Sequence, residues 1–318
     1  MKKDGKIKQE SENMSSIVVV GSMAFDSIET PFGNVGKVLG GSANYFSLSA
    51  AYFAPVRCVS VVGEDFPAEH LELLKKRKID IEGIKKETGK TFHWAGSYGY
   101  DLNQANTLAT HLNVFEKFEP VLPEAYRSSE FVMLGNIAPP LQMKVLSQIQ
   151  SPKFIALDTM NFWIEGQRDA LIEAIARCHA LIINEGELRQ LTKTYNIVQA
   201  AKVIRTWGPQ ILVVKRGEYG AILFDHGEVF SVPGLLLAEV KDPTGAGDTF
   251  AGGFMGYLAS QAHFSLSRYT LRKAIVYGSV MASFTVQDFG FQDLLGLTRE
   301  VIDERYRRFV ELTAFHLD

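Results

Sequence analysis

The chain has 318 residues and a formal net charge of −3, and 46% of its residues are hydrophobic. This length and composition predict one large core or two modest ones. The slightly acidic balance argues against a basic surface for binding a nucleic-acid backbone, and the absence of an 18-residue apolar run argues against a membrane span. The seven histidines show no HExxH or paired spacing, so no structural zinc site is expected.

The first residues of the chain differ from the rest. Residues 1–15 are polar and lack the apolar segment of a secretory signal, so we expect a disordered extension. Residues 16–318 are expected to form a single large domain. The two cysteines, Cys58 and Cys178, are far apart and flanked by apolar residues, which is typical of buried thiols in a reducing, cytoplasmic environment.

Short apolar runs recur along the chain, and each ends on a small or polar residue. Runs of this kind are typical of strands buried on both faces, and helix-like stretches separate several of them. The alternation predicts a three-layer α/β/α fold with a mostly parallel central sheet. Ligands of such sheets bind beyond the carboxyl ends of the strands. The predicted strands are 17–20, 56–62, 131–134, 154–157, 180–183 and 211–214, and the predicted helices include 141–149, 169–178 and 198–207.

Two segments break this alternation. Residues 90–116 contain two extended runs around a polar turn, with aromatic side chains at period two in the first run, which predicts an antiparallel hairpin. Residues 27–38 are short, turn-rich and not helical. The two segments are expected to form a small β lid that shields a reaction from water, or an edge that packs on the domain or on the second subunit of a homodimer. The aromatic residues of the hairpin are Phe92, Trp94, Tyr98 and Tyr100.

The most informative segment is residues 242–248, DPTGAGD, which precede a helix with an apolar face. Small residues at Gly245, Ala246 and Gly247 let several backbone N–H groups approach a ligand, and a helix N-terminus adds partial positive charge. Together they predict an anion hole for a phosphoryl group. Asp248 opposes anion binding unless it takes a proton from a hydroxyl that attacks the phosphate. The alternative interpretation is that Asp248 caps the helix.

Two motifs give the chain a resemblance to the ribokinase-like (PfkB) family of carbohydrate kinases. One is the D-x-x-G-A-G-D run that ends at Asp248, and the other is the run from Gly40 and Gly41 to Asn44 at the start of a helix. The resemblance covers about residues 17–290. It implies an ATP-dependent kinase that transfers the γ-phosphate to a primary hydroxyl of a small sugar. A nucleoside kinase is the alternative acceptor class, and a non-catalytic nucleotide- or sugar-binding regulator is the alternative of another class.

The resemblance also implies individual roles. Asp26, Gly40, Gly41 and Asn44 would hold the acceptor, although Asp26 could be a turn residue and Asn44 a helix N-cap. Asp248 would be the base, beside the anion hole of Gly245, Ala246 and Gly247. The residues implied at the nucleotide are Asn184, Glu187, Lys215, Gly217, Gly220 and Thr244.

Two cations are implied as well. Glu187 would help hold Mg²⁺ through water, which suits an ion that keeps its hydration shell. Asp242 is a candidate neighbour of a monovalent cation such as K⁺. Lys215 would either pair with phosphate or be a solvated charge. Asp158 and Asn161 resemble a D-x-N run of the family, but Phe162 and Trp163 follow where the family usually has a basic residue.

Overall fold

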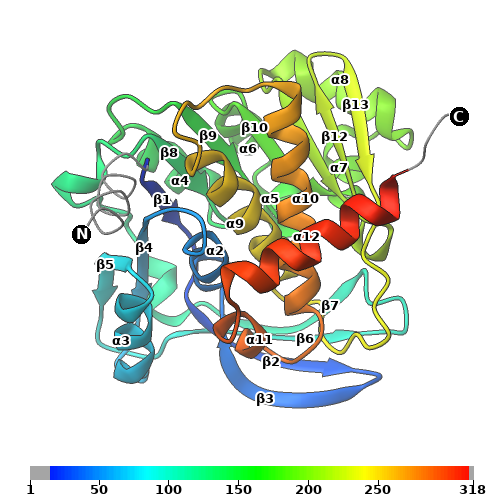
Figure 1. Cartoon of the computed structure of the whole chain (residues 1–318). Helices are drawn as coiled ribbons and strands as arrows, with labels where there is room; N and C mark the ends of the chain where they lie inside the picture. Colours follow the sequence, from blue (N-terminus) through cyan, green and yellow to red (C-terminus); the bar gives the residue numbers. More distant parts are fainter. Residues whose placement is uncertain (1–14, 315–318) are drawn as a thin grey trace, which may run out of the picture.

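The computed structural model describes residues 15–314, so the expected N-terminal extension lies almost wholly outside the described residues (Figure 1). Within them, a nine-stranded sheet has the order β13-β12-β11-β10-β9-β8-β1-β4-β5. Seven strands are parallel, and β12 and β13 add an antiparallel edge. The strands are β1 (Ile17–Val20), β4 (Val56–Val62), β5 (Ile79–Lys86), β8 (Phe131–Leu134), β9 (Phe154–Leu157), β10 (Ala180–Asn184), β11 (Ile211–Lys215), β12 (Ala221–Asp225) and β13 (Glu228–Val232).

Helices cover both faces of this sheet, which confirms the predicted three-layer α/β/α fold (Figure 1). One face packs on α2, α9 and α10, and the other on α4, α6, α7 and α8. The helices are α2 (Ser42–Ala50), α3 (Ala68–Lys76), α4 (Pro139–Leu146), α5 (Asn161–Gly166), α6 (Arg168–Ile175), α7 (Glu185–Thr192), α8 (Ile197–Trp207), α9 (Ala246–Ala259), α10 (Arg268–Thr285), α11 (Gln292–Leu295) and α12 (Arg299–Thr313), with short 3₁₀ helices η1 (Asn113–Lys117), η2 (Glu124–Tyr126) and η3 (Gly217–Tyr219).

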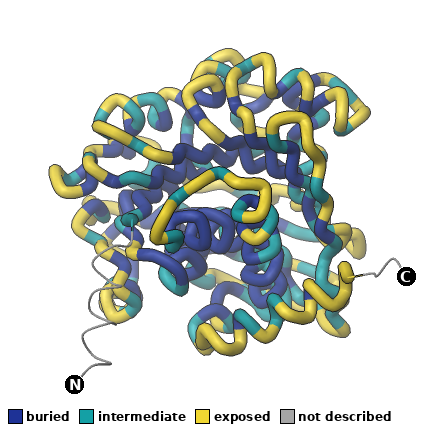
Figure 2. Tube along the Cα trace, turned by 45° about the horizontal axis from the view of Figure 1, so that its top comes forward, coloured by how far each residue is buried: buried dark blue, intermediate teal, exposed yellow. Residues whose placement is uncertain are grey.

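The core consists of two apolar clusters, one on each side of the sheet. Ile17 and Val19 of β1 face the cluster with α2 and α9, whereas Val18 and Val20 face the other. Successive strand residues point to opposite faces, so a strand buried on both sides must be apolar at every position. Figure 2 shows the buried trace running through the centre of the molecule.

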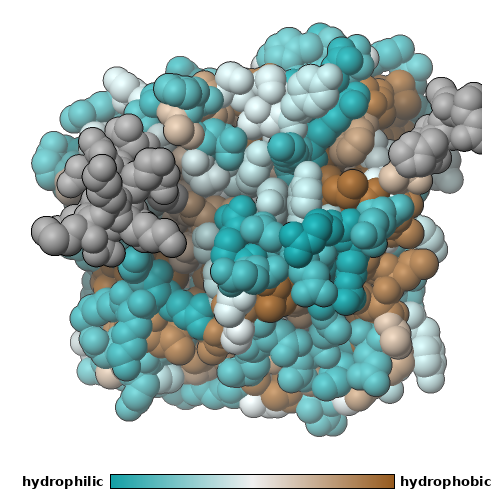
Figure 3. All heavy atoms as spheres, in the orientation of Figure 1, coloured by the Kyte–Doolittle hydropathy of each residue, from teal (hydrophilic) through white to brown (hydrophobic). Residues whose placement is uncertain are grey.

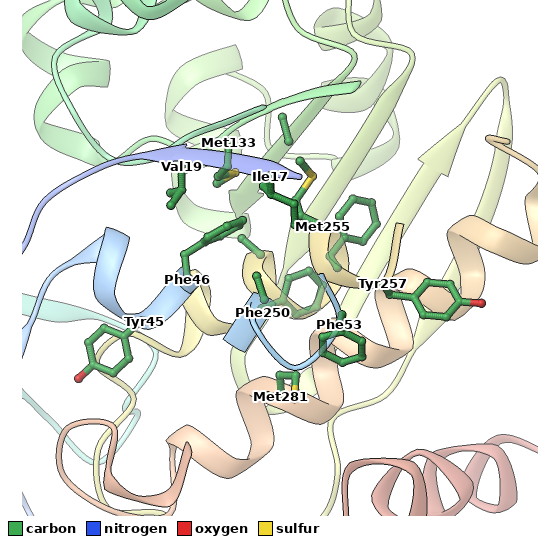
Figure 4. Close-up of a cluster of buried hydrophobic side chains, with 14 of the residues drawn as sticks. Ile17, Val19, Tyr45, Phe46, Phe53, Met133, Phe250, Met255, Tyr257 and Met281 are labelled. Carbon is green, nitrogen blue, oxygen red and sulfur yellow. The ribbon is translucent and has the colours of Figure 1, made fainter. Parts of the chain in front are cut away.

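Helix α9 is buried along almost its whole length. The sequence predicts one apolar face for this helix, but the structure buries it on all sides, since Thr249–Ala259 are all buried. The helix lies between α2 and α10, and its Phe250 and Met255 belong to the same apolar cluster as Phe46 of α2 (Figure 4). The N-terminus of α9 is therefore held by packing on several sides.

Both predicted lid segments belong to one separate sheet with the order β3-β2-β6-β7, at the bottom of Figure 1. The second run of the hairpin ends earlier than expected, because the chain turns into η1. Strands β2 and β6 pair in parallel, whereas both hairpins are antiparallel. The strands are β2 (Ala24–Thr30), β3 (Gly33–Gly40), β6 (Phe92–Tyr98) and β7 (Ala105–His111).

The surface is mixed in character. On the face seen in Figure 3, hydrophilic residues dominate along α12, and apolar patches lie between polar ones. Among residues 15–314, no helix has the length and apolar character needed to cross a membrane.

Candidate active site

Asp26, the carboxylate predicted to hold the acceptor, belongs to the lid sheet. It lies within β2 rather than in a turn, and it is 5% exposed. A Cβ at Gly40 would overlap this carboxylate, which also accepts a hydrogen bond from the N–H of Gly41. Burial, followed by the charges of Asp242 and Asp248, raises the pKa of Asp26 to about 8. A buried carboxyl group that receives so few hydrogen bonds from the protein is suited to accept hydrogen bonds from the hydroxyl groups of a ligand.

The helix start beside Asp26 is built on Gly41, the N-cap of α2, with φ at 94°. A Cβ there would lie 2.8 Å from the amide nitrogen of Ala24, so only glycine fits. Asn44 is fully buried; its Nδ2 donates to the Gly40 carbonyl at 2.7 Å, and its Oδ1 pairs with Nε2 of His70 at 2.9 Å. The N-cap interpretation of Asn44 is therefore wrong, and its side chain braces Gly40.

The predicted anion hole lies at the start of α9. Gly245 is the N-cap, with φ at 74°, and it packs on the ring of Tyr45 without room for a Cβ. The amide of Ala246 donates to the carbonyl of Pro243 at 3.1 Å. Within the described chain, the amides of Gly245 and Gly247 have no acceptor. Two free amides at a helix N-terminus can bind an anion. Of the three residues predicted to form the anion hole, Ala246 therefore does not offer a free amide.

Asp248 is the third residue of α9, so the alternative that it caps the helix is wrong. Burial, followed by the charge of Asp158, raises the pKa of Asp248 to about 7, while Lys215 acts in the opposite direction. A carboxyl group that titrates near neutral pH, beside free amides, can accept a proton from a hydroxyl group.

Lys215 is not a solvated charge, and that alternative is also wrong. Its side chain is 16% exposed, and its ammonium nitrogen lies 3.2 and 3.3 Å from the two carboxylate oxygens of Asp158. Burial lowers the pKa of Lys215, but the charges of Asp158 and Glu187 outweigh this and raise it. A Cβ at Gly247 would lie 2.9 Å from Nζ, so the ammonium group borders the anion hole.

Asn184 and Glu187 form a reciprocal capping box at the start of α7. Asn184 Oδ1 accepts from the Glu187 amide at 2.8 Å, and Glu187 Oε2 accepts from the Asn184 amide at 3.1 Å. Burial raises the pKa of Glu187 to about 7 against the effect of Lys215. Within residues 15–314, no group of three or more His, Cys, Asp or Glu side chains forms a metal cage. A single carboxylate beside the predicted phosphate site fits Mg²⁺, which keeps waters and relies on substrate phosphates.

The loop before α9 is tied to the C-terminal loop by Asp242, which is fully buried. Its carboxylate accepts from the amide of Thr244 at 2.8 Å and from the amide of Gly290 at 3.4 Å. Burial raises the pKa of Asp242. Whether a monovalent cation binds here stays a prediction.

The lid touches the body at two of the predicted nucleotide positions. The hydroxyl of Thr244 donates to the hydroxyl of Tyr98 at 3.2 Å. The side chain of Asn103, in the loop between β6 and β7, lies against Gly217 and leaves no room there for a Cβ. Gly217 and Gly220 flank η3, directly after β11, so this loop lies between the lid and the sheet.

An aromatic ring lies beside Asp26 on the lid. Trp94 is the in-register partner of Asp26, so the two side chains leave the same face of the sheet. Gly96 follows two residues later, and the Trp94 ring occupies the space that a side chain there would take. Tyr98, four residues after Trp94, contacts the body from this face. The lid therefore carries a carboxylate and an indole ring on the face that contacts the body.

Some of these contacts were not predicted. His70 and Asn103 gave no signal, since each is a lone polar residue in an ordinary surface pattern. Asn161 was considered with Asp158, but it is exposed, and its Oδ1 accepts from the amide of Phe162. The D-x-N run thus contributes its aspartate, and not its asparagine, to the site.

A model of the pfkB family of carbohydrate kinases matches residues 14–295. A cytidine kinase from Thermococcus kodakarensis is 32% identical over 252 residues, which cover 77% of this chain and 89% of that protein.

Solved structures share the fold. The nucleoside kinase of Methanocaldococcus jannaschii superimposes with a TM-score of 0.74 at 22% identity, covering 93% of this chain and 99% of that one. The nucleoside kinase of Burkholderia thailandensis in complex with inosine gives 0.76 at 18% identity, covering 92% and 97%.

Proposed function

Because the chain belongs to the pfkB family of carbohydrate kinases, and is thus a phosphotransferase with a hydroxyl acceptor, we propose that it is an ATP-dependent nucleoside kinase. The observation that carries the kinase assignment is Asp248 beside the free amides of Gly245 and Gly247. A carboxylate that repels an anion is useful there only if it receives a proton during the reaction.

The proposed reaction follows from these positions. Asp248 accepts the proton of the acceptor hydroxyl, the hydroxyl oxygen forms a bond to the γ-phosphorus, and the bond to the bridging oxygen breaks to release ADP. The amides of Gly245 and Gly247 stabilise charge on the transferring group. When bound with the nucleotide, Mg²⁺ would neutralise phosphate charge, and Glu187 is the residue expected to hold it through water.

Two side chains of the lid, Asp26 and Trp94, favour a nucleoside as the acceptor. Trp94 and Asp26 leave the same face, so a ribose hydroxyl pair on Asp26 would place a base within reach of the indole ring. Stacking on an aromatic side chain suits any base. The names of the relatives favour the same class. A small sugar remains the second candidate, because Asp26 alone can bind vicinal hydroxyls and the matching family model is named for carbohydrate kinases.

Turnover tests these alternatives. ADP release is measured with ATP and Mg²⁺ against a panel of nucleosides, ribose and fructose. The proposal expects kcat/KM to be highest with a nucleoside, and turnover only with sugars would favour the second candidate. Nucleotide binding without turnover of any acceptor would favour a non-catalytic regulator. The predicted K⁺ site near Asp242 is tested by exchanging K⁺ for tetramethylammonium, and the predicted homodimer through the lid by light scattering.

A further inference from the structure

The ion pair between Lys215 and Asp158 has no role in the reaction described so far. It joins the ends of β11 and β9, two strands separated only by β10. The side chains are 16% and 6% exposed, so both charges are largely removed from water. A buried ion pair is often no more stable than an apolar pair of the same size. Stability alone therefore gives little reason to place these charges in the site.

The geometry of the pair leaves the ammonium group only partly engaged. Its distances of 3.2 and 3.3 Å to the two oxygens exceed the 2.7–2.9 Å typical of charge-assisted bonds. An ammonium group has three donors. Within the described chain, Asp158 supplies the only acceptor bonded to Nζ. At least one donor is thus available to a ligand.

The free donor lies next to the proposed phosphoryl position. A Cβ at Gly247 would come within 2.9 Å of Nζ, so the ammonium group and the free amide of Gly247 border the same space. Three carboxylates lie close enough to the ammonium group to raise its pKa, namely Asp158, Glu187 and Asp248. A phosphoryl group entering among them needs a fixed positive charge beside the amides.

Asp158 is itself held rigidly. Its amide donates to the carbonyl of Leu134 at 2.9 Å, and its Oδ1 accepts from the amide of Thr159 at 2.9 Å. The side chain of Gln142 donates to the Asp158 carbonyl at 3.1 Å. Because the aspartate is fixed by several bonds, it can set the position of a flexible lysine.

We propose that Lys215 is a catalytic residue that contacts the transferring phosphoryl group and that Asp158 is the positioning residue that holds its ammonium group at the anion hole. This inference rests on the proposed kinase function. On phosphate binding, the ammonium group keeps its contact with Asp158 and donates its free N–H to a phosphoryl oxygen. No proton is transferred, so Lys215 stabilises charge in the transition state more than it binds the acceptor.

The test uses Lys215→Met, Asp158→Asn and the double variant. Lys215→Met should lower kcat by roughly 10²–10³-fold, the range for a lost transition-state donor, with the acceptor KM within about 3-fold of wild type. The single Lys215→Met variant leaves Asp158 buried without a partner and should lose stability for that reason alone. The double variant removes both charges, so it should regain the melting temperature of the wild type. It should still turn over as slowly as Lys215→Met, because Asp158 acts through the lysine.

A matched control is the pair Lys153 and Glu130, whose side chains meet at the amino ends of β9 and β8, the ends opposite to Asp158. Lys153→Met with Glu130→Gln should leave kcat within about 2-fold of wild type, as expected for an exposed ion pair. Recovery of kcat in the Lys215 and Asp158 double variant would overturn the proposal, because it would show that the pair is only structural.

A binding measurement makes the result independent of the acceptor. Calorimetry should show that Lys215→Met weakens β,γ-methylene-ATP by about 10-fold or more and ADP by less than about 3-fold, since only the former carries a γ-phosphoryl group. Equal affinities in wild type and variant would overturn the role of Lys215 alone. A wild-type protein that binds neither nucleotide would overturn the proposed kinase function itself.

Discussion

Replacing Asp26 by asparagine should stabilise the protein while weakening acceptor binding. The pKa of this carboxyl group is raised from 3.8 to about 8 by burial and then by Asp242 and Asp248. A group whose folded-state pKa lies above its unfolded value stabilises the fold most below the unfolded pKa, and this stability is lost as pH rises through the folded pKa. The ionised form therefore costs on the order of 5 kcal/mol above pH 8, at about 1.4 kcal/mol per pKa unit.

Asparagine has the shape of the neutral form and does not ionise. It also weakens the hydrogen bond from the Gly41 amide, at a cost of about 1 kcal/mol, so the net gain should be about 4 kcal/mol at pH 8. For a chain of this length, that corresponds to about 4–8 °C in melting temperature. The same substitution should raise the acceptor KM by roughly 10–100-fold and leave the KM for ATP nearly unchanged, because a charge-assisted bond to hydroxyl groups is lost.

Thermal melts of wild type and Asp26→Asn between pH 5 and pH 8.5 measure the effect, and the gain should shrink steadily toward acid pH. Asp65→Asn is the matched control, because the pKa of Asp65 is shifted in the opposite direction. Burial acts to raise the pKa of Asp65, but two hydrogen bonds from Thr91 outweigh it and lower the pKa. Asp65→Asn should therefore destabilise at neutral pH. An Asp26→Asn protein that melts no higher than wild type at pH 8, or by the same margin at every pH, would refute the reasoning.

Further predictions concern the reaction itself. Asp248→Asn should keep ATP binding but lower kcat by roughly 10²–10⁴-fold, the range for a lost general base, and turnover within a few-fold of wild type would contradict that role. Because burial and Asp158 raise the pKa of Asp248 to about 7, kcat/KM should fall as pH drops below about 7; a flat profile from pH 5.5 to 8.5 argues against this base. Gly247→Val should lower turnover by about 10²-fold or more by crowding the free amides, whereas Gly166→Val, where no atom lies within 4 Å of the added Cβ, should not. Trp94→Ala should raise KM for nucleosides by about 5–100-fold and leave ribose unaffected if the indole stacks a base; equal effects on both would place the ring elsewhere.

The central sheet was predictable because each of its buried strands is apolar at every position. The run 17–20 is the clearest case, since Ile17 and Val19 serve one core and Val18 and Val20 the other. The motif ending at Asp248 was also predictable, because the glycines and the carboxylate are neighbours in the chain. Patterns of this kind can be recognised from neighbouring residues alone, because they do not depend on which distant segments pack against them.

Contacts between distant segments could not be predicted in the same way. The parallel pairing of β2 with β6 joins residues 68 positions apart, and alternation alone does not specify which strands pair. The sequence alone allows Lys215 to face either phosphate or solvent, because its partner, Asp158, lies 57 residues earlier. Knowing that β9, β10 and β11 are neighbours would have brought these two strand ends together.

The β2–β3 hairpin is attached to the body by very short tethers. Only residues 21–23 separate β1 from β2, and α2 begins two residues after β3 ends. Any swing of this hairpin must therefore pivot close to Ala24. At about 3.3 Å per residue, Asp26 lies roughly 7 Å from that pivot and Thr30 roughly 20 Å. The tip then moves about three times as far as the carboxylate, so a swing that widens the entrance at the tip displaces the partner for the hydroxyl groups much less.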